Sequence, residues 1–304
     1  PLEVSLDDLP FPAWETVGGP ARYNHGAPHR YLLKPYAPVL ALRGCPNRCT
    51  FCDSSAFACS TPLRVRRPRK VVEEVRYLQA RYGVREIQFA EPLFNWNRDW
   101  VLEMCDRLGR LHEPVAWSCH VRMDSLDEEL LGRMVQAGCW NILFGVESTN
   151  VDVLNAANKP LDIPQVFHLV KAASRMGCQT TASFVFGLPL STEKTIRQTI
   201  EDAIYMEPDY AQFFLHKSVS GEPMHEGDRV LSGFEVRANE IPGRLYLPKG
   251  IASAEQLREL QREAYRRFYL RPNYILRRTR SLLKPGQIAR LFDGVSRLGG
   301  LLKP

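Results

Sequence analysis

The segment Arg43–Ser55, RGCPNRCTFCDSS, holds three of the chain's eight cysteines within eight residues. They are Cys45, Cys49 and Cys52, and their spacing is C-x3-C-x2-C. The segment directly follows an apolar run that predicts a strand over residues 38–42. A tight group of three thiolates can bind zinc or an iron–sulfur cluster.

Zinc sites and iron–sulfur clusters differ in the number of protein ligands that they need. A structural zinc site takes four protein ligands, and Cys59 is the only further cysteine close to the triplet. Three ligands on a four-iron cluster would leave one iron open to a small molecule, so that the cluster could take part in catalysis. From these residues alone, an iron–sulfur cluster and a zinc site with Cys59 as fourth ligand both stay open.

Composition indicates an ordinary globular protein, with 44% hydrophobic and 24% charged residues in 304. No apolar run approaches the roughly 18–20 residues that span a bilayer, and no signal peptide is recognisable. We therefore expect a cytoplasmic protein whose cysteines are reduced and serve a metal or catalysis rather than disulfides. Because the sequence opens with Pro1, we expect a fragment or a processed form.

Positive charge is concentrated near the end of the chain. From Glu255 onward there are twelve Lys or Arg residues against four Asp or Glu, while the whole chain has a net charge of +6. This pattern predicts amphipathic helices with solvated arginines. We do not expect a nucleic-acid partner, and a peripheral contact with an anionic membrane stays open as an alternative.

Between Ala37 and His216, short apolar runs alternate six times with helical patterns. Near-continuous apolar runs are typical of parallel strands that are buried on both faces. The expected strands are 38–42, 86–89, 115–119, 141–144, 181–186 and 211–215. Repeated strand–helix units form either an open doubly wound sheet or a barrel, and in both folds ligands bind beyond the carboxyl ends of the strands.

The helices have recognisable starts and apolar faces. Ser125–Glu128, SLDE, predicts a capping box that opens one helix, and Asp162 predicts the start of the next. Ile196, Ile200 and Ile204 repeat every four residues, which predicts a helix face that packs on the sheet. The stretches between the strands are therefore expected to be helical.

The cysteine motif, with the aromatic Phe51 directly before Cys52, resembles the signature of the radical S-adenosylmethionine (radical SAM) enzymes. The resemblance implies an α/β fold, a partial (β/α)6 TIM-like barrel with an N-terminal linker and a C-terminal helical extension. It also implies a 4Fe-4S cluster held by Cys45, Cys49 and Cys52, and S-adenosylmethionine (SAM) as second cofactor. SAM would be cleaved reductively to methionine and a 5′-deoxyadenosyl radical, with an electron donor such as flavodoxin or ferredoxin.

The same resemblance assigns cofactor contacts to residues that follow later strands. Glu91, in FAEPLFNWN, is the carboxylate available to hold the amino group of SAM. Arg122, in SCHVRMD, would pair with the SAM carboxylate, and His120 would line the pocket. Glu147, in FGVESTN, would face SAM, with Ser148 as its polar neighbour.

The fifth predicted strand runs into FVFGLP, residues 184–189. Gly187 permits a close approach of the backbone, and the flanking apolar residues could pack on adenine. In outline this resembles the glycine-containing motif on the adenine side of SAM in the same family.

Three segments outside the expected barrel resemble one branch of the family, the enzymes with a cobalamin-binding domain. These segments are Leu6–Trp14 (LDDLPFPAW), Ser220–Glu226 (SGEPMHE) and Phe268–Arg278 (FYLRPNYILRR). In that branch, a linker of the LPFPAW type joins an N-terminal cobalamin domain to the barrel. We therefore expect cobalamin as a cofactor, bound by an upstream partner domain that is not present in this chain.

The expected organisation is a linker over residues 1–36, a radical SAM barrel over 37–220, and a loop followed by a basic helical extension over 221–304. The expected function is cobalamin-dependent methyl transfer, or a related radical modification, on a small molecule, lipid or natural product. The alternatives are a methylthiotransferase-like or other radical SAM enzyme acting on RNA, and a non-catalytic metal-binding module.

Overall fold

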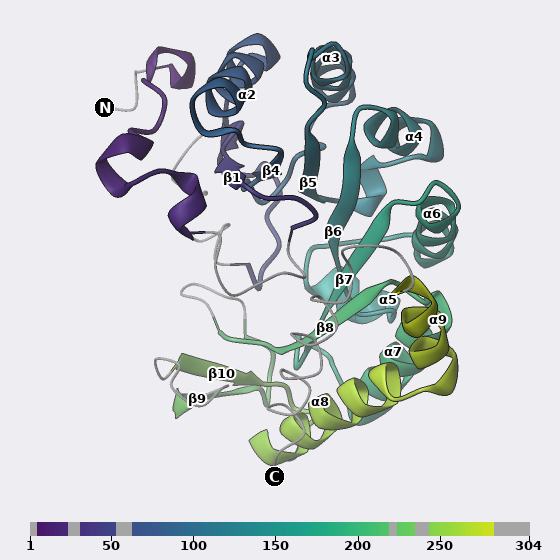
Figure 1. Ribbon diagram of the computed structural model, residues 1–304. Coiled ribbons are helices and arrows are strands. Elements are labelled where there is room, and N and C mark those ends of the chain that lie inside the picture. Colours follow the sequence, from purple (N-terminus) through teal and green to yellow (C-terminus); the bar gives the residue numbers. More distant parts are fainter. Residues whose placement is uncertain (1–4, 24–30, 53–62, 219–223, 235–242, 283–304) are drawn as a thin grey trace.

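Six parallel strands form the central sheet of the computed structural model, which describes residues 5–23, 31–52, 63–218, 224–234 and 243–282 (Figure 1). The strands are β1 (Tyr36–Val39), β4 (Glu86–Phe89), β5 (Ala116–Val121), β6 (Cys139–Glu147), β7 (Gln179–Phe186) and β8 (Tyr210–Leu215). They follow one another in sequence order across the sheet, from β1 to β8, and each neighbouring pair is parallel. The expected α/β class is confirmed, and the sheet is consistent with a partial barrel.

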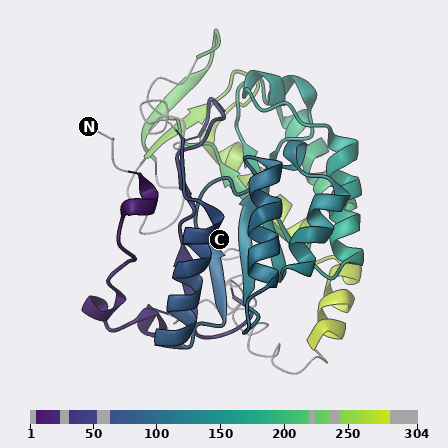
Figure 2. The ribbon, with the colours of Figure 1, turned by 90° about the horizontal axis from the view of Figure 1, so that it is seen from above.

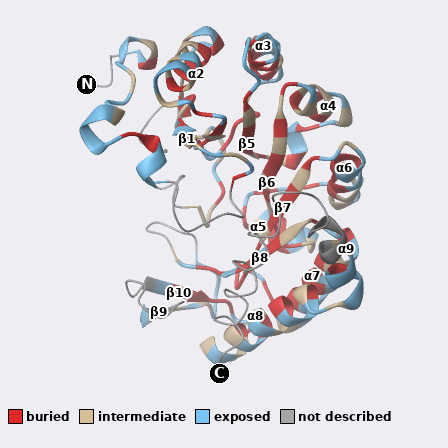
Figure 3. Cartoon of the chain, in the orientation of Figure 1, coloured by how far each residue is buried: buried red, intermediate tan, exposed pale blue. Residues whose placement is uncertain are grey.

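Helices cover the outer face of this sheet, as Figures 1 and 3 show. They are α2 (Pro68–Tyr82), α3 (Arg98–Gly109), α4 (Glu128–Gln136), α5 (Val151–Ala156), α6 (Ile163–Arg175) and α7 (Glu193–Met206). Their apolar faces are buried against the strands; in α7, Ile196 and Ile200 are buried as expected and Ile204 is half-buried. All seven described cysteines are reduced thiols, and the four outside the triplet are buried in the core.

The capping box predicted at the start of α4 is wrong. The helix begins at Glu128, and its N-terminal cap is Asp127, whose carboxylate accepts a hydrogen bond of 2.7 Å from the Leu130 amide. Ser125 lies instead in a preceding 3-10 turn, and its carbonyl accepts a hydrogen bond from the Asn95 side chain. Because Asn95 holds this turn in place, the chain enters the helix two residues later than the sequence pattern suggests.

The N-terminal arm, residues 5–23, runs along α2 in the same direction as the helix (Figures 1 and 2). Asp7 binds the cap residue of α2, Arg67, through an ion pair of 2.6 Å and a hydrogen bond of 3.0 Å to its amide. At the other end of the helix, Glu15 accepts a hydrogen bond of 3.3 Å from the Tyr82 hydroxyl. The arm therefore begins at the end of α2 that lies next to the carboxyl ends of the strands.

A β-hairpin occupies part of the stretch that the sequence predicted to be loop-rich. Strands β9 (Arg229–Phe234) and β10 (Gly243–Leu247) pair in antiparallel fashion. Tyr246 in β10 is fully buried, and its hydroxyl donates a hydrogen bond to the Asp228 carboxylate. The hairpin was missed because such short strands gain their stability from packing on the rest of the fold.

The expected helical extension is present as α8 (Ala254–Tyr269) and α9 (Pro272–Leu282), and residues 283–304 lie outside the described part. Helix α8 packs on β8: the Tyr265 hydroxyl accepts a hydrogen bond from the Phe213 amide, and the two rings meet edge to face at 5.2 Å. None of the helices in the described part is both long and apolar enough to cross a membrane.

Candidate functional site

The cysteine loop, residues 44–52, lies beyond the carboxyl end of β1. A short ribbon closes its base, in which β2 (Leu42–Arg43) pairs with β3 (Arg64–Val65). Cys49 is buried, while Cys45 and Cys52 are half-exposed. Cys59, the further zinc ligand considered above, lies outside the described residues.

Hydrogen bonds fasten the cysteine loop to the turn that follows α5. The Thr50 amide donates to the Ala157 carbonyl at 3.1 Å, and the Asn158 side chain donates to the Arg48 carbonyl at 2.8 Å. Phe51 packs against a small apolar cluster that includes Ala157. Phe51 thus anchors the loop directly beside Cys52, and the turn after α5 fixes the position of the predicted ligands.

Two basic side chains lie close to Cys49. The Arg122 guanidinium is 3.4 Å from the Cys49 sulfur and also forms an ion pair of 2.6 Å with Asp124. Burial raises the pKa of Cys49, and the positive charges of Lys159 and Arg122 oppose that shift. Both cations therefore favour the thiolate, which is the form that ligates iron.

Lys159, which the sequence reasoning missed, forms a buried ion pair with Glu147. The Lys159 ammonium lies 2.6 Å from the Glu147 carboxylate, and each side chain is only 8% exposed. The ammonium also lies 6.0 Å from the centre of the Phe51 ring. The pair thus stands between the end of β6 and the cysteine loop, and it brings Glu147 to the predicted site.

The backbone around Glu147 is specialised for this pair. Glu147 has a φ of 66°, a left-handed conformation that is uncommon for residues other than glycine. A Cβ atom on Gly145 would lie 1.8 Å from the Glu147 carboxylate oxygen and 2.6 Å from the Lys159 nitrogen. Only glycine at position 145 therefore leaves room for the ion pair as it stands.

The neighbouring Ser148 has local partners. Its hydroxyl lies 3.4 Å from the Thr199 hydroxyl and accepts a hydrogen bond of 3.1 Å from the Asn150 amide. These contacts shape the turn into α5, where Asn150 is the N-terminal cap. A direct contact of Ser148 with a cofactor stays a prediction.

Glu91 is completely buried beneath the strand that leads into the cysteine loop. One carboxylate oxygen accepts a hydrogen bond of 3.2 Å from the Ala41 amide, and the other has no hydrogen-bond partner within the described ranges. Burial raises the pKa of Glu91 to about 8. These contacts give Glu91 a part in holding the start of the loop, and its contact with the amino group of SAM stays a prediction.

His120 lies beside Glu91 at the end of β5. Burial lowers the pKa of His120, and a hydrogen bond with the Glu91 backbone opposes this shift. The His120 Nδ1 atom is buried and makes no hydrogen bond to any described residue. An unsatisfied buried polar atom costs about 1–3 kcal/mol, so a ligand or water that reached it would be stabilised.

The pKa of Glu91 predicts a pH effect on stability that Glu91→Gln removes. Folding raises this pKa from an ordinary 4.5 to about 8, so the folded state binds the proton more tightly than the unfolded state. The resulting stabilisation is complete below pH ~4.5 and is lost as the pH rises towards ~8, by up to roughly 4–5 kcal/mol.

We expect denaturant unfolding to show a free energy of unfolding that falls less steeply with pH in Glu91→Gln than in the wild type. Asp99→Asn, which alters an acidic residue in the first turn of α3, is the matched control and should keep the wild-type slope. Parallel pH curves for Glu91→Gln and the wild type would contradict the assignment.

Gly187 follows β7 with a φ of 91°. A Cβ atom at this position would lie 3.1 Å from the Leu257 side chain and 3.3 Å from the Tyr246 carbonyl oxygen. The close approach that the sequence predicted is therefore made by β10 and α8 of the same chain. Its role beside adenine stays a prediction.

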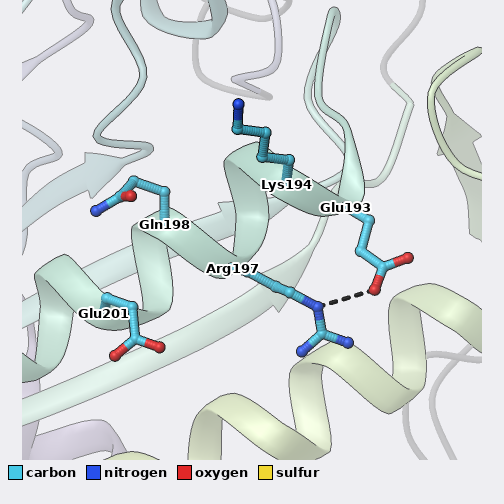
Figure 4. Close-up of a pocket in the computed structure, with 5 residues that line it drawn as sticks. All are labelled: Glu193, Lys194, Arg197, Gln198 and Glu201. Carbon is cyan, nitrogen blue, oxygen red and sulfur yellow. Dashed lines mark hydrogen bonds and ion pairs between the residues drawn. The ribbon is translucent and has the colours of Figure 1, made fainter.

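A surface hollow of about 540 Å³ lies on the outer side of α7, and Figure 4 shows the five side chains that line it. Glu193 and Arg197 form an ion pair of 2.8 Å there, and Arg197 also binds Glu263 of α8. None of the predicted site residues lines this hollow. It is therefore a feature of the helical surface and not part of the candidate site.

The candidate site is thus the cysteine loop with Arg122, Glu147 and Lys159 around it. In the structure the side chains of Cys, His, Asp and Glu within the described ranges, the three cysteines of the loop included, are not arranged in a group that could hold a metal ion. The fit to an iron–sulfur cluster rests on the donor set, three thiols within eight residues, and on the two cations beside Cys49.

Comparison with curated proteins finds relatives over most of the chain. An uncharacterised methyltransferase of Pyrococcus horikoshii is 28% identical over 280 residues, which cover 91% of this chain and 59% of the relative. The anaerobic magnesium-protoporphyrin IX monomethyl ester cyclase of Cereibacter sphaeroides is 26% identical, over 88% of this chain and 47% of the enzyme. The chain thus spans about half the length of these relatives.

Solved structures share the fold. The radical S-adenosylmethionine methyltransferase TsrM from Kitasatospora setae, solved with cobalamin and a 4Fe-4S cluster bound, superposes with a TM-score of 0.62 at 16% identity, over 74% of this chain and 52% of TsrM. The sequence model of the Radical SAM superfamily matches residues 39–203, which is more than half of the chain and includes the cysteine loop and the Glu147–Lys159 pair. The chain belongs to the radical SAM superfamily.

Proposed function

We propose that this chain is the catalytic core of a cobalamin-dependent radical SAM methyltransferase, or of a closely related radical enzyme, acting on a small molecule, lipid or natural product. The observation that carries the proposal is the cysteine loop, fixed at the carboxyl ends of the strands with Arg122 and Lys159 beside Cys49. Cys45, Cys49 and Cys52 would hold a 4Fe-4S cluster. When bound, the cluster and SAM supply the reductive cleavage that gives methionine and a 5′-deoxyadenosyl radical.

The charges near the loop suit the amino-acid end of SAM, which carries an ammonium and a carboxylate. Glu147 offers a carboxylate to the ammonium, while Arg122 and Lys159 offer cations to the carboxylate. Because Glu147 and Lys159 are buried and already paired, they present both charges in fixed positions. Water has little access to them, which strengthens their electrostatic interactions.

The course of the N-terminal arm supports a cobalamin domain as partner. The arm starts at the end of α2 where Asp7 binds Arg67, near the same edge of the sheet as the cysteine loop. A domain joined to the arm would therefore approach the sheet from the side where SAM binds. The TsrM structure, which contains bound cobalamin, supports this partner. Flavodoxin or ferredoxin would serve as electron donor.

The proposed substrate is a small organic molecule. The Cereibacter relative is named for a porphyrin ester, a small molecule. We infer a small organic substrate that reaches the carboxyl ends of the strands.

Product analysis tests the proposal directly. The protein, with any sequence that adjoins this chain, is purified anaerobically and supplied with iron, sulfide, hydroxocobalamin, SAM and a strong reductant. We expect both 5′-deoxyadenosine and S-adenosylhomocysteine, the second reporting methyl transfer from SAM. Deoxyadenosine alone would place the protein in a non-methylating branch. Neither product, or zinc in place of iron and sulfide, would favour a metal-binding module.

A further inference from the structure

Large apolar side chains are exposed where α8 ends and α9 begins. Leu270 is 50% exposed, Ile275 48% and Leu276 52%, and Tyr205 at the end of α7 is 71% exposed. We call Leu270, Ile275 and Leu276 the apolar patch. Scattered exposed apolar residues are common on proteins, but three within seven residues at one corner of the fold form a local feature.

A cationic groove of about 860 Å³ adjoins the apolar patch, between α7 and α8. It is lined by four arginines, two glutamates, Ile204 and Leu270, so positive charge is in excess within the lining. Two of these arginines, Arg262 and Arg267, form ion pairs with Glu255 and Glu201. Arg266 in the lining is exposed. The Arg271 guanidinium lies 4.2 Å from the Phe268 ring and donates to the Ile204 carbonyl. Its Nε and Nη2 atoms are buried and bond to none of the described residues.

The sequence of α9 extends this positive charge. The helix contains three arginines and no acidic residue. One of them, Arg277, donates to the carbonyls of Glu207 and Pro208 in the turn before β8, which fixes α9 against the body of the protein. Tyr274 adds a hydrogen bond of 3.2 Å to the Asp209 carbonyl. The helix that carries Ile275 and Leu276 is therefore fixed to the body of the protein.

We propose that this corner docks reversibly on an anionic lipid bilayer. The apolar patch would enter the interface between headgroups and acyl chains, and the exposed Arg266 would lie near lipid phosphates. The excess of arginines in the sequence of α8 and α9 would add attraction to an anionic surface. Charge complementarity selects this partner. A nucleic acid would match the arginines but offers no partner for exposed aliphatic side chains, and a second copy would bring arginines against arginines.

Docking at this corner leaves the cysteine loop accessible. Helix α9 packs on the turn that precedes β8, whereas the cysteine loop lies beyond the carboxyl ends of the strands. Figure 2 shows α9 at the opposite end of the molecule from the β9–β10 hairpin. The interaction is independent of the proposed chemistry, since it uses none of the residues assigned to the cofactors.

Vesicle co-sedimentation tests the inference. The complete chain is mixed with vesicles of phosphatidylcholine alone or of phosphatidylcholine with phosphatidylglycerol, at low and high salt. We expect binding only to the anionic vesicles and a marked loss at high salt. The double variant Ile275→Ser/Leu276→Ser should bind about 30-fold more weakly because two aliphatic side chains no longer leave water. Arg266→Gln should bind about fivefold more weakly.

Leu9→Ser is the matched control, because Leu9 is 42% exposed on the N-terminal arm and lies outside the corner. It should bind vesicles like the wild type. Equal binding to neutral vesicles, no binding to either kind, or an unchanged double variant would each overturn the inference. It would also be overturned if the double substitution converted a dimer into a monomer without changing lipid binding, since the patch would then be an interface between copies.

Discussion

Cys49→Ala should abolish both the iron–sulfur cluster and SAM cleavage. Cys49 is the buried member of the triplet, and it is the one whose sulfur lies beside Arg122 and within the field of Lys159. Without this ligand a four-iron cluster would keep only two cysteines and would be lost on purification. Iron and sulfide content, visible absorption and 5′-deoxyadenosine formation should all fall to background in anaerobically reconstituted protein.

Cys105→Ala provides the matched control. Cys105 is buried in the apolar face of α3, so its replacement should cost about 1 kcal/mol of stability and leave the cluster intact. A Cys49→Ala protein that kept its colour and cleaved SAM at the wild-type rate would contradict the assignment of Cys45, Cys49 and Cys52. Loss of colour in both variants would indicate a general folding defect instead.

The sequence was sufficient to predict the sheet and the edge that carries the site. Near-continuous apolar runs identified all six strands because parallel strands are buried on both faces. Polar residues directly after such runs, including Arg122 and Glu147, were then expected to gather at one edge. The structure brings both of them to the cysteine loop, since Arg122 contacts Cys49 and Glu147 pairs with Lys159 next to Phe51.

Lys159 could not be predicted because no local pattern distinguishes it from an exposed lysine. It lies twelve residues after Glu147, beyond a short helix, and its partner is decided by how the turn after α5 folds back on the end of β6. The only local signal is the turn itself, Asn158–Pro160, in which Asn158 has a φ of 51°. Burial of a lysine depends on tertiary packing, as does the space left by Gly145.

The fully buried state of Glu91 was hidden for a similar reason. Glu91 follows β4, and in the sequence nothing distinguishes it from the other polar residues that follow strands. Its Ala41 partner is fifty residues away, and the contact depends on the way β1 leads into the cysteine loop. A sequence pattern identifies the edge of the sheet, while the depth of each side chain is set by segments that are distant in sequence.

Lys159→Met should destabilise the protein by about 3–5 kcal/mol, because it leaves the Glu147 carboxylate buried without its cation. Methionine is an unbranched side chain only one atom shorter than lysine, so most of the loss reports the charge rather than a cavity. The free energy of unfolding, measured by denaturant titration under anaerobic conditions, checks this value. Arg107→Met, which removes an exposed ion pair with Glu103, is the control and should cost less than about 1 kcal/mol.

The double variant Lys159→Met/Glu147→Gln separates the ion pair from other effects of the substitution. Replacing both charges removes the uncompensated carboxylate, so most of the lost stability should return. SAM binding should nevertheless stay weak in the double variant, because neither charge would be available to the amino-acid end of SAM. If stability returned together with wild-type SAM affinity, the pair would be purely structural. If the double variant were as unstable as Lys159→Met, the buried charge would not be the cause.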